Sequence, residues 1–303
     1  MRSIQCGAAL GNGRTGLLLW GGGRTLNVTL GCADLWDHRG HREWNDRMNF
    51  RDLRAALETG ELQNVRKLLE TPGVNLKFGA SIIPLGRVVV TLPEGCELLR
   101  FDLDFTSGIA TLFYGCGDAV GTFEFAADMT MQDIGACRDL PEGTDVELIP
   151  AYQLSLGNGA ASLKEARNFE PPRIFTLEDG AAFTQELPDD PSCSVLCRRH
   201  HRGFTVSMRR GETEISSWQT VPAEHIFASS EKWFREYFAG VPSVECGDWE
   251  LDEIYWHGMY RYGIATNPAG VSPGLQGPWI EDDSLPPWAG DYHFNINVQL
   301  CNS

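Results

Sequence analysis

The sequence predicts a mainly β fold, with an antiparallel β-sandwich over the first two-thirds of the chain and helices after it. The first observation is a series of short apolar or alternating runs, interrupted by glycine, proline and aspartate at near-regular spacing. The second is the run 98–105, in which every second residue from Leu99 to Phe105 is apolar. A period of two with one polar face is typical of an antiparallel strand packed on a core. The third is a change to helical spacing after residue 225.

The strands are expected to begin with a hairpin, because two apolar runs at 15–20 and 24–30 are joined by Gly21–Gly23. A strand at 88–92 follows a Pro-Leu-Gly turn. Further strands are expected at 98–105, 109–115, 121–127, 145–156, 181–187, 193–197 and 204–208. So many short strands with turn residues between them favour a β-sandwich.

One helical insert is expected within the strands, near residues 51–70. Apolar residues stand there at helical spacings, namely Leu53, Leu57, Val65, Leu68 and Leu69. Gly60 lies between the two halves of this pattern and should divide it into two short helices.

Helical patterns also follow the strands. Residues 229–240 open with serines and Glu231, which suit a helix N-terminus, and end at Gly240. The run 248–266 predicts an amphipathic helix with one apolar face formed by Leu251, Ile254, Tyr255, Met259 and Tyr262. A loop rich in glycine and proline follows over 267–290.

These patterns divide the chain into a β-domain at 1–225, a helical linker at 226–246 and the start of an α-domain at 247–303. The last part has room for about two helices of 10–14 residues with their loops. Two amphipathic helices cannot bury their apolar stripes alone. We therefore expect the chain to be the N-terminal part of a longer protein.

Charge and hydropathy exclude several classes of partner. The chain has 41 acidic and 25 basic residues and a formal net charge of −16, which repels a phosphate backbone, so we expect no nucleic-acid partner. No run approaches the roughly 18 apolar residues that a membrane-spanning helix needs. The first 13 residues contain no apolar segment typical of a signal peptide, so a cytoplasmic location is expected. The oligomeric state stays open.

Cofactor and metal sites are not expected. The nine cysteines include no CxxC pair, the histidines show no ligand spacing, and small buried thiols in a reducing compartment are the favoured interpretation. Gly11–Gly16 matches GxGxxG, and Asp34 lies near the offset of a ribose-binding acid. However, the motif runs into LLLWGGG, where three glycines would end any helix, so a dinucleotide site is disfavoured. These glycines more naturally let a strand turn tightly against another part of the protein.

Carboxylates and uncharged polar groups near the C-terminal end are the candidates for chemistry. Glu281, Asp282 and Asp283 could supply the paired carboxylates of glycoside hydrolysis, but a solvated acidic loop is the favoured interpretation. In an extended segment, Asn295 and Asn297 would present their amides on one side. An amide both donates and accepts, so such a pair can hold a water or a sugar hydroxyl.

The neighbours of these amides strengthen the interpretation. Trp279, Trp288 and Tyr292 offer flat apolar faces that suit sugar rings. The remaining candidate substrate-binding residues are Asp291, His293 and Gln299. An ordinary loop with buried, satisfied amides remains the alternative, because buried polar groups must be hydrogen-bonded in any case.

Several runs resemble glycoside hydrolase family 95 of the six-hairpin glycosidase superfamily, in the order in which they occur there. They are LGNGRTGLLLWGG (10–22), ADLWDHRG (33–40), PLGRVVVTLP (84–93), LLRFDLDFTSGIAT (98–111) and GLQGPWIEDDSLPPWAGDYHFNINVQ (274–299). The resemblance therefore extends over nearly the whole chain, although residues 115–220 match poorly.

The resemblance implies a supersandwich-like N-domain, a helical linker and an (α/α)6 barrel that holds the sugar. It implies an inverting α-L-fucosidase in which Asn295 and Asn297 orient the attacking water with a carboxylate base, while His293, Trp279 and Trp288 line the pocket. The family's general acid and base lie on later helices, so the 303-residue chain alone should be inactive.

Two other functions stay open. One is a non-catalytic carbohydrate-binding or interaction module, in which the sandwich itself holds the ligand. The other is part of a phosphorylase from a related helical-barrel family, which would need phosphate for turnover. A carbohydrate partner is expected under all of these interpretations.

Overall fold

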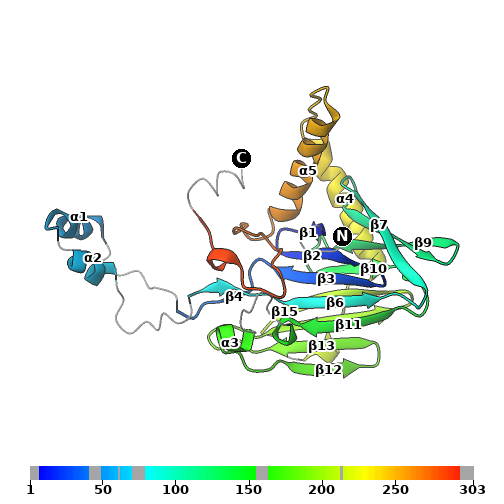
Figure 1. Cartoon of the computed structure of the whole chain (residues 1–303), viewed down its shortest axis with the longest axis horizontal. Helices are drawn as coiled ribbons and strands as arrows, with labels where there is room; N and C mark the ends of the chain where they lie inside the picture. Colours follow the sequence, from blue (N-terminus) through cyan, green and yellow to red (C-terminus); the bar gives the residue numbers. More distant parts are fainter. Residues whose placement is uncertain are drawn as a thin grey trace.

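The computed structural model of the chain describes residues 7–40, 49–60, 62–69, 79–154, 163–211 and 214–293 (Figure 1). The prediction of a mainly β fold with large antiparallel sheets is confirmed, since every strand pair described is antiparallel. Within these ranges, no helix is long and apolar enough to cross a membrane.

Two large sheets form the body of the molecule. The five-stranded sheet has the order β1 (Ala8–Gly11), β2 (Thr15–Gly22), β3 (Thr25–Cys32), β6 (Gly86–Thr91), β11 (Asp145–Pro150). The eight-stranded sheet has the order β12 (Arg173–Leu177), β13 (Gly180–Gln185), β14 (Cys193–His200), β15 (Gly203–Arg210), β10 (Gly135–Arg138), β9 (Ala119–Ala127), β8 (Ile109–Cys116), β7 (Cys96–Asp104). A short pair of strands, β4 (Trp36–Asp37) and β5 (Ser81–Ile82), lies beside them.

The core forms where the inward faces of the two large sheets meet. In β6, Val88 and Val90 are fully buried, whereas the intervening residues point to the other side. They belong to one cluster with Phe123 and Phe125 of β9, whose rings meet edge to face. The alternation along each strand therefore produces two apolar faces, and burying them against each other drives the sheets together.

Strand β7 departs from its predicted alternation at one position. Phe101 and Leu103 are partly buried, as expected, but Leu99 is 52% exposed. The register with β8 shifts between Leu98 and Arg100, so Leu99 is the extra residue of a β-bulge. The extra residue interrupts the alternation of side chains at this point. Leu98, and not Leu99, therefore faces the core together with Phe101 and Leu103.

Short helices connect or interrupt the strands. The predicted insert is confirmed as α1 (Phe50–Glu58) and α2 (Leu62–Leu69), separated near Gly60, which has a left-handed backbone. Asn49 caps α1 by accepting a hydrogen bond from the Asp52 amide. The other short helices are η2 (Ala151–Gln153), α3 (Leu163–Arg167), η3 (Ile215–Ser217) and η4 (Pro287–Gly290).

Helix α4 (Ala223–Gly240) begins six residues before the predicted start at residue 229. Pro222 precedes it with a backbone conformation that leads into the first turn. The additional residues include Ile226 and Phe227, which are buried in a small cluster with residues of β8, β9 and β10. Tertiary packing therefore extends the helix beyond the sequence signal.

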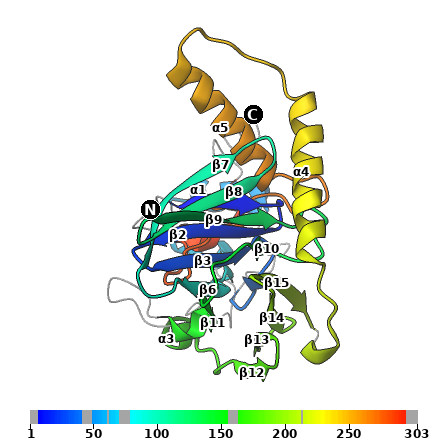
Figure 2. The same cartoon turned by 90° about the vertical axis from the view of Figure 1, so that its right-hand side faces the viewer.

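Helix α5 (Trp249–Ala265) is confirmed, and its predicted apolar face is not the face that packs on the sandwich. Leu251 and Ile254 are 51% and 67% exposed, whereas Tyr260 and Ile264 are fully buried. The Tyr260 hydroxyl donates to the Ala9 carbonyl at 2.9 Å, and its ring stacks between Phe105 and Phe234. These contacts fix which face of the helix meets the sandwich. Figure 2 shows the N-terminal half of α5 rising clear of the sheets.

The cysteines are only partly as expected. Cys96 and Cys116 form a disulfide between directly paired positions of β7 and β8, so the prediction of thiols throughout is wrong for these two. Burial raises the pKa of Cys193 and Cys197 to about 12, which keeps both thiols protonated. No group of three or more His, Cys, Asp or Glu residues in the described ranges could hold a metal ion.

A buried ion cluster ties β4 to the chain around α3. Asp37 is fully buried and accepts hydrogen bonds from the guanidinium groups of Arg39 and Arg167, each at 2.8 Å. Burial alone would raise the pKa of Asp37, but the hydrogen bonds from Arg39 and Arg167 and the charge of Arg167 lower it below its ordinary value.

This lowered pKa predicts a specific loss of stability in acid. In the unfolded chain, the pKa of an aspartate is about 3.9. The contribution of Asp37 to the free energy of unfolding is therefore fully present above that pH, and it is lost as the pH falls through the lower pKa of the folded state. We expect the free energy of unfolding, measured with urea between pH 6 and 2, to fall less steeply at the acid end in Asp37→Asn. The exposed-site control Asp102→Asn should keep the original slope, and equal slopes for the parent and Asp37→Asn would contradict the assignment.

Candidate functional site

The segment after α5 lies on a surface of glycines in the five-stranded sheet. A Cβ atom at Gly16 would stand 2.6 Å from the Trp279 ring, and one at Gly13 would stand 2.5 Å from the Asn267 amide. A Cβ at Gly31 would overlap the Pro278 carbonyl. We call Gly11, Gly13, Gly16 and Gly31 the glycine surface. Side chains at these positions would prevent the segment from approaching.

The GxGxxG match is part of this surface and lacks the geometry of a dinucleotide site. Gly11 ends β1 and Gly16 pairs with it at the start of β2, so the motif forms an antiparallel hairpin. A dinucleotide fingerprint would instead lead from a strand into a helix. The tight approach expected of these glycines is confirmed by their contacts with Asn267 and Trp279.

Trp279 anchors the segment to the sheet. Its indole N–H donates to the Leu10 carbonyl at 2.9 Å, and its ring lies against Gly11 and Gly16. These contacts direct its N–H to the protein backbone. Trp279 therefore holds the segment in place. Its indole is only partly buried, so the exposed part could still contact a ligand.

Asp282 is a buried ion-pair residue, and its interpretation as part of a solvated acidic loop is wrong. Its carboxylate is fully buried and receives two hydrogen bonds from Arg87, at 2.6 and 2.9 Å. The Thr29 hydroxyl donates to the same carboxylate at 2.8 Å. Burial raises the pKa of Asp282, against the opposing effects of Arg87 and Thr29. These bonds join the segment to β3 and β6.

Sequence reasoning missed Arg87 and Thr29, although one signal was available. Arg87 is the only charged residue in GRVVVT, an otherwise apolar strand followed by core residues. A lone arginine in such a strand needs a buried acidic partner. Its guanidinium also lies 5.1 Å from the Trp20 ring, which restricts its orientation further.

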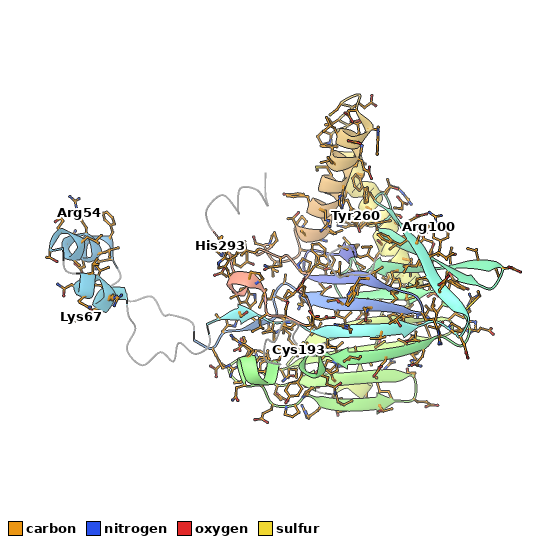
Figure 3. All side chains as sticks on the ribbon, in the orientation of Figure 1. Arg54, Lys67, Arg100, Cys193, Tyr260 and His293 are labelled. Atoms are coloured by element: carbon orange, nitrogen blue, oxygen red, sulfur yellow. A yellow bond between two sulfur atoms is a disulfide. The ribbon has the colours of Figure 1, made fainter. Side chains whose placement is uncertain are left out.

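The predicted substrate-binding residues Trp288, Asp291, Tyr292 and His293 lie together at the end of the segment (Figure 3 labels His293). Trp288 is 75% exposed and its ring centroid lies 5.8 Å from that of His293. The His293 Nε2 atom lies 2.6 Å from a carboxylate oxygen of Asp291. The Tyr292 hydroxyl donates to the Ser272 carbonyl, and burial raises the pKa of Tyr292.

The backbone at this position is constrained. Trp288 and Ala289 have φ values of 50° and 60°, which non-glycine residues rarely adopt, and Gly290 follows with 67°. A Cβ at Gly290 would overlap the Ile82 side chain of β5. This close packing against β5 holds the turn that exposes the Trp288 ring. Trp279, by contrast, lies against β1 and β2 and not in this group.

Asn295, Asn297 and Gln299 lie outside the described residues, so their predicted roles stay predictions. His293 is the last described residue before them. The structure therefore brings together Trp288, Asp291, Tyr292 and His293, and it places them directly before the two asparagines in the sequence.

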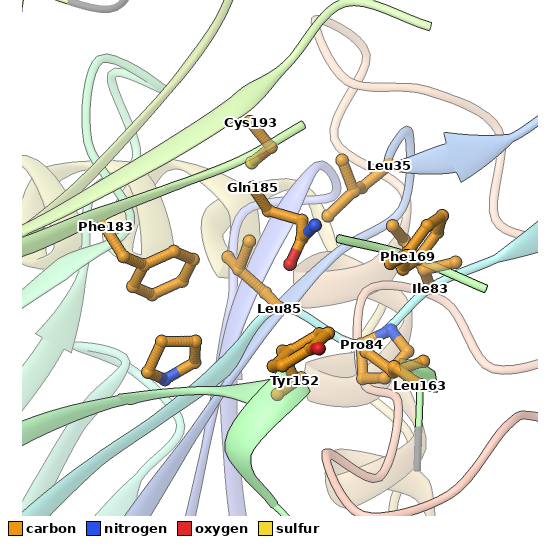
Figure 4. Close-up of a pocket in the computed structure, with 12 residues that line it drawn as sticks. Leu35, Ile83, Pro84, Leu85, Tyr152, Leu163, Phe169, Phe183, Gln185 and Cys193 are labelled. Atoms are coloured by element: carbon orange, nitrogen blue, oxygen red, sulfur yellow. The ribbon is translucent and has the colours of Figure 1, made fainter. Parts of the chain in front are cut away.

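An enclosed hollow inside the sandwich does not serve as a sugar site. It has a volume of about 10 Å³ and is lined mainly by apolar side chains such as Leu85, Tyr152 and Phe183 (Figure 4). A space of this size holds at most one water molecule. None of the predicted site residues that the structure describes lines it.

Comparisons with known proteins give a fold and one short sequence match. No family model matches the chain. A protein of Aspergillus niger named "Probable alpha-fucosidase A" is 43% identical over 47 residues, which are 16% of this chain and 6% of that protein. A solved structure, named provisionally as a kojibiose phosphorylase from human microbiome, matches with a TM-score of 0.52 at 11% identity. That match covers 91% of this chain and 39% of the other chain, so this chain spans well under half the length of these relatives.

The glycine surface predicts a sharp effect of one added methyl group. We expect Gly16→Ala to lower the free energy of unfolding by about 1–3 kcal/mol, because the new Cβ displaces Trp279. Limited proteolysis should then cut within 267–290 more rapidly than in the parent. Gly79→Ala is the control, since no heavy atom lies within 4 Å of its Cβ position. Unchanged stability and protease resistance in Gly16→Ala would show that the segment is not held there.

Proposed function

We propose that the chain is the N-terminal part of a carbohydrate-active enzyme that hydrolyses α-L-fucoside-like glycosidic bonds with inversion. The observation that carries this proposal is the group of Trp288, Asp291 and His293 on an anchored segment. An exposed indole face suits the C–H face of a sugar, and the imidazole and carboxylate can bond its hydroxyls. The short match to a named alpha-fucosidase supports the same substrate class.

In this mechanism, the uncharged side-chain amides of Asn295 and Asn297 orient the attacking water. Inversion requires a water on the face of the sugar opposite the leaving group, with two carboxyl groups about 6.5–9.5 Å apart. Asn295 and Asn297 would orient that water, and a base elsewhere in the enzyme would take its proton. Neutral amides do not repel the positive charge that develops on the sugar ring, and they do not form a competing ester.

The exposed face of α5 supports a further helical domain. Trp249, Leu251 and Ile254 are all more than half exposed, although they are large apolar residues on one helix. Such a helix is normally covered by another layer. We propose that α5 and the segment after it form the first wall of an (α/α)6 barrel and that the general acid and base belong to its later helices.

Assay of the 303-residue chain and of the protein from the complete reading frame tests this function. With 4-nitrophenyl α-L-fucoside, we expect turnover only by the complete protein, with the β-anomer of the sugar appearing first by NMR. Asn295→Ala and Asn297→Ala should each lower kcat by about 100-fold, because the water loses its orientation, while the thermal unfolding midpoint stays unchanged.

Other outcomes would contradict the proposal in distinct ways. A sugar phosphate formed only with added inorganic phosphate would identify a phosphorylase. Sugar binding without turnover by the complete protein would identify a carbohydrate-binding module. Robust turnover by the 303-residue chain would show that the catalytic groups lie within it.

A further inference from the structure

A second candidate ligand site lies between α4 and α5. A hollow of about 360 Å³ opens there, where the two helices converge toward the sandwich (Figure 2). Its lining includes Trp233, Glu236 and Tyr237 of α4 and Tyr262, Gly263 and Thr266 at the end of α5. Pockets that hold small ligands begin at about 300 Å³, so the hollow can accept one or two sugar rings.

Aromatic rings form one wall of this hollow. The Trp233 and Tyr237 rings stack with centroids 5.0 Å apart and planes inclined by 12°. A Cβ at Gly263 would already touch both, at 3.0 Å from Tyr237 and 3.4 Å from Trp233. Because residue 263 has no side chain, these rings meet α5 closely and are held in one orientation. The Tyr237 hydroxyl donates to the Met259 carbonyl at 2.8 Å, which fixes that ring further.

The described lining of the hollow carries a carboxylate and hydroxyls. Glu236 has a mostly exposed carboxylate, whose nearest basic partner, Lys232, lies 4.0 Å away. Tyr262 is 40% exposed, and the Thr266 hydroxyl donates to the Tyr262 carbonyl. Among the described residues, no Lys, Arg or His lines this hollow, so its lining offers an anionic ligand no counter-charge. Ring faces beside a carboxylate and hydroxyls suit a neutral polyol.

Two other hollows of the described surface lack this chemistry. One, of about 660 Å³, includes Glu124 and Arg138, whose side chains pair with each other at 2.6 Å. Another, of about 340 Å³, includes Arg199 and Arg202, whose guanidinium groups donate to backbone carbonyls. These four charged groups are therefore already engaged within the protein, and neither hollow has a stacked ring pair among the described residues of its lining.

We propose that the hollow between α4 and α5 binds a neutral saccharide unit through Trp233, Glu236 and Tyr262. This site lies apart from the group at Trp288 and His293, and its binding does not depend on turnover. It would retain a carbohydrate chain on the helical side of the protein, whatever bond the enzyme cleaves.

Titration of the 303-residue chain by NMR tests this site directly. With kojibiose or methyl α-L-fucoside as the probe, we expect the indole N–H signal of Trp233 to shift. Tyr262→Ala and Glu236→Gln change partly exposed or exposed side chains, so both should fold. Each should weaken binding by about tenfold, which corresponds to about 1.4 kcal/mol. Trp249→Ala, at the opposite end of α5, is the matched control and should leave the affinity unchanged.

The results of this titration distinguish the site between α4 and α5 from the proposed function. Absence of a Trp233 shift at millimolar probe, or equal affinity in Tyr262→Ala, would overturn the proposal. A Trp233 shift with tetramethylammonium chloride but with neither sugar would also overturn it, by identifying a site for an organic cation. Sugar binding that survives in the chain while the complete protein shows no hydrolysis would support this site and reject the proposed function.

Discussion

The buried ion pair between Arg87 and Asp282 is the interaction on which the candidate site depends. It joins the middle of the first sheet to a loop almost two hundred positions later in the chain, with Thr29 completing the carboxylate's bonds. Breaking such a pair from one side is costly, because the remaining charge stays buried without a partner. The pair therefore restricts the loop to one docked position, and the glycine surface permits that position sterically.

This arrangement gives the β-sandwich a role in positioning the proposed sugar site. Trp279 and Asp282 fix the loop to β1, β2, β3 and β6, and Gly290 packs against β5. The constrained turn at Trp288 is then supported through Gly290 by Ile82 of β5. A loop held this way keeps its geometry independently of more distant parts of the protein, as a preorganised site requires.

Local sequence patterns predicted most of the fold. They could not predict features that depend on partners far along the chain. Period-two alternation located the strands, and Gly60 divided the helical insert. Helix α5, however, carries apolar residues on more than one face, and only its contact with Ala9 and Phe105 selects Tyr260 as the buried one. The bulge at Leu99 and the burial of Asp282 likewise depend on partners far along the chain. The candidate residues at 288–293 were predictable because their sequence is unusual, whereas their anchors were not.

A double-mutant cycle on Arg87 and Asp282, read by urea unfolding and by hydrogen exchange across 274–290, shows whether this ion pair holds the loop on the sheet. We expect Arg87→Met and Asp282→Asn each to lower the free energy of unfolding by about 3–5 kcal/mol, and the double variant to lower it by clearly less than their sum. Both single variants should also speed amide exchange in the loop. Single-variant losses below about 0.5 kcal/mol that simply add in the double variant, with amide exchange unchanged, would show that other contacts hold the loop and that the ion pair does not.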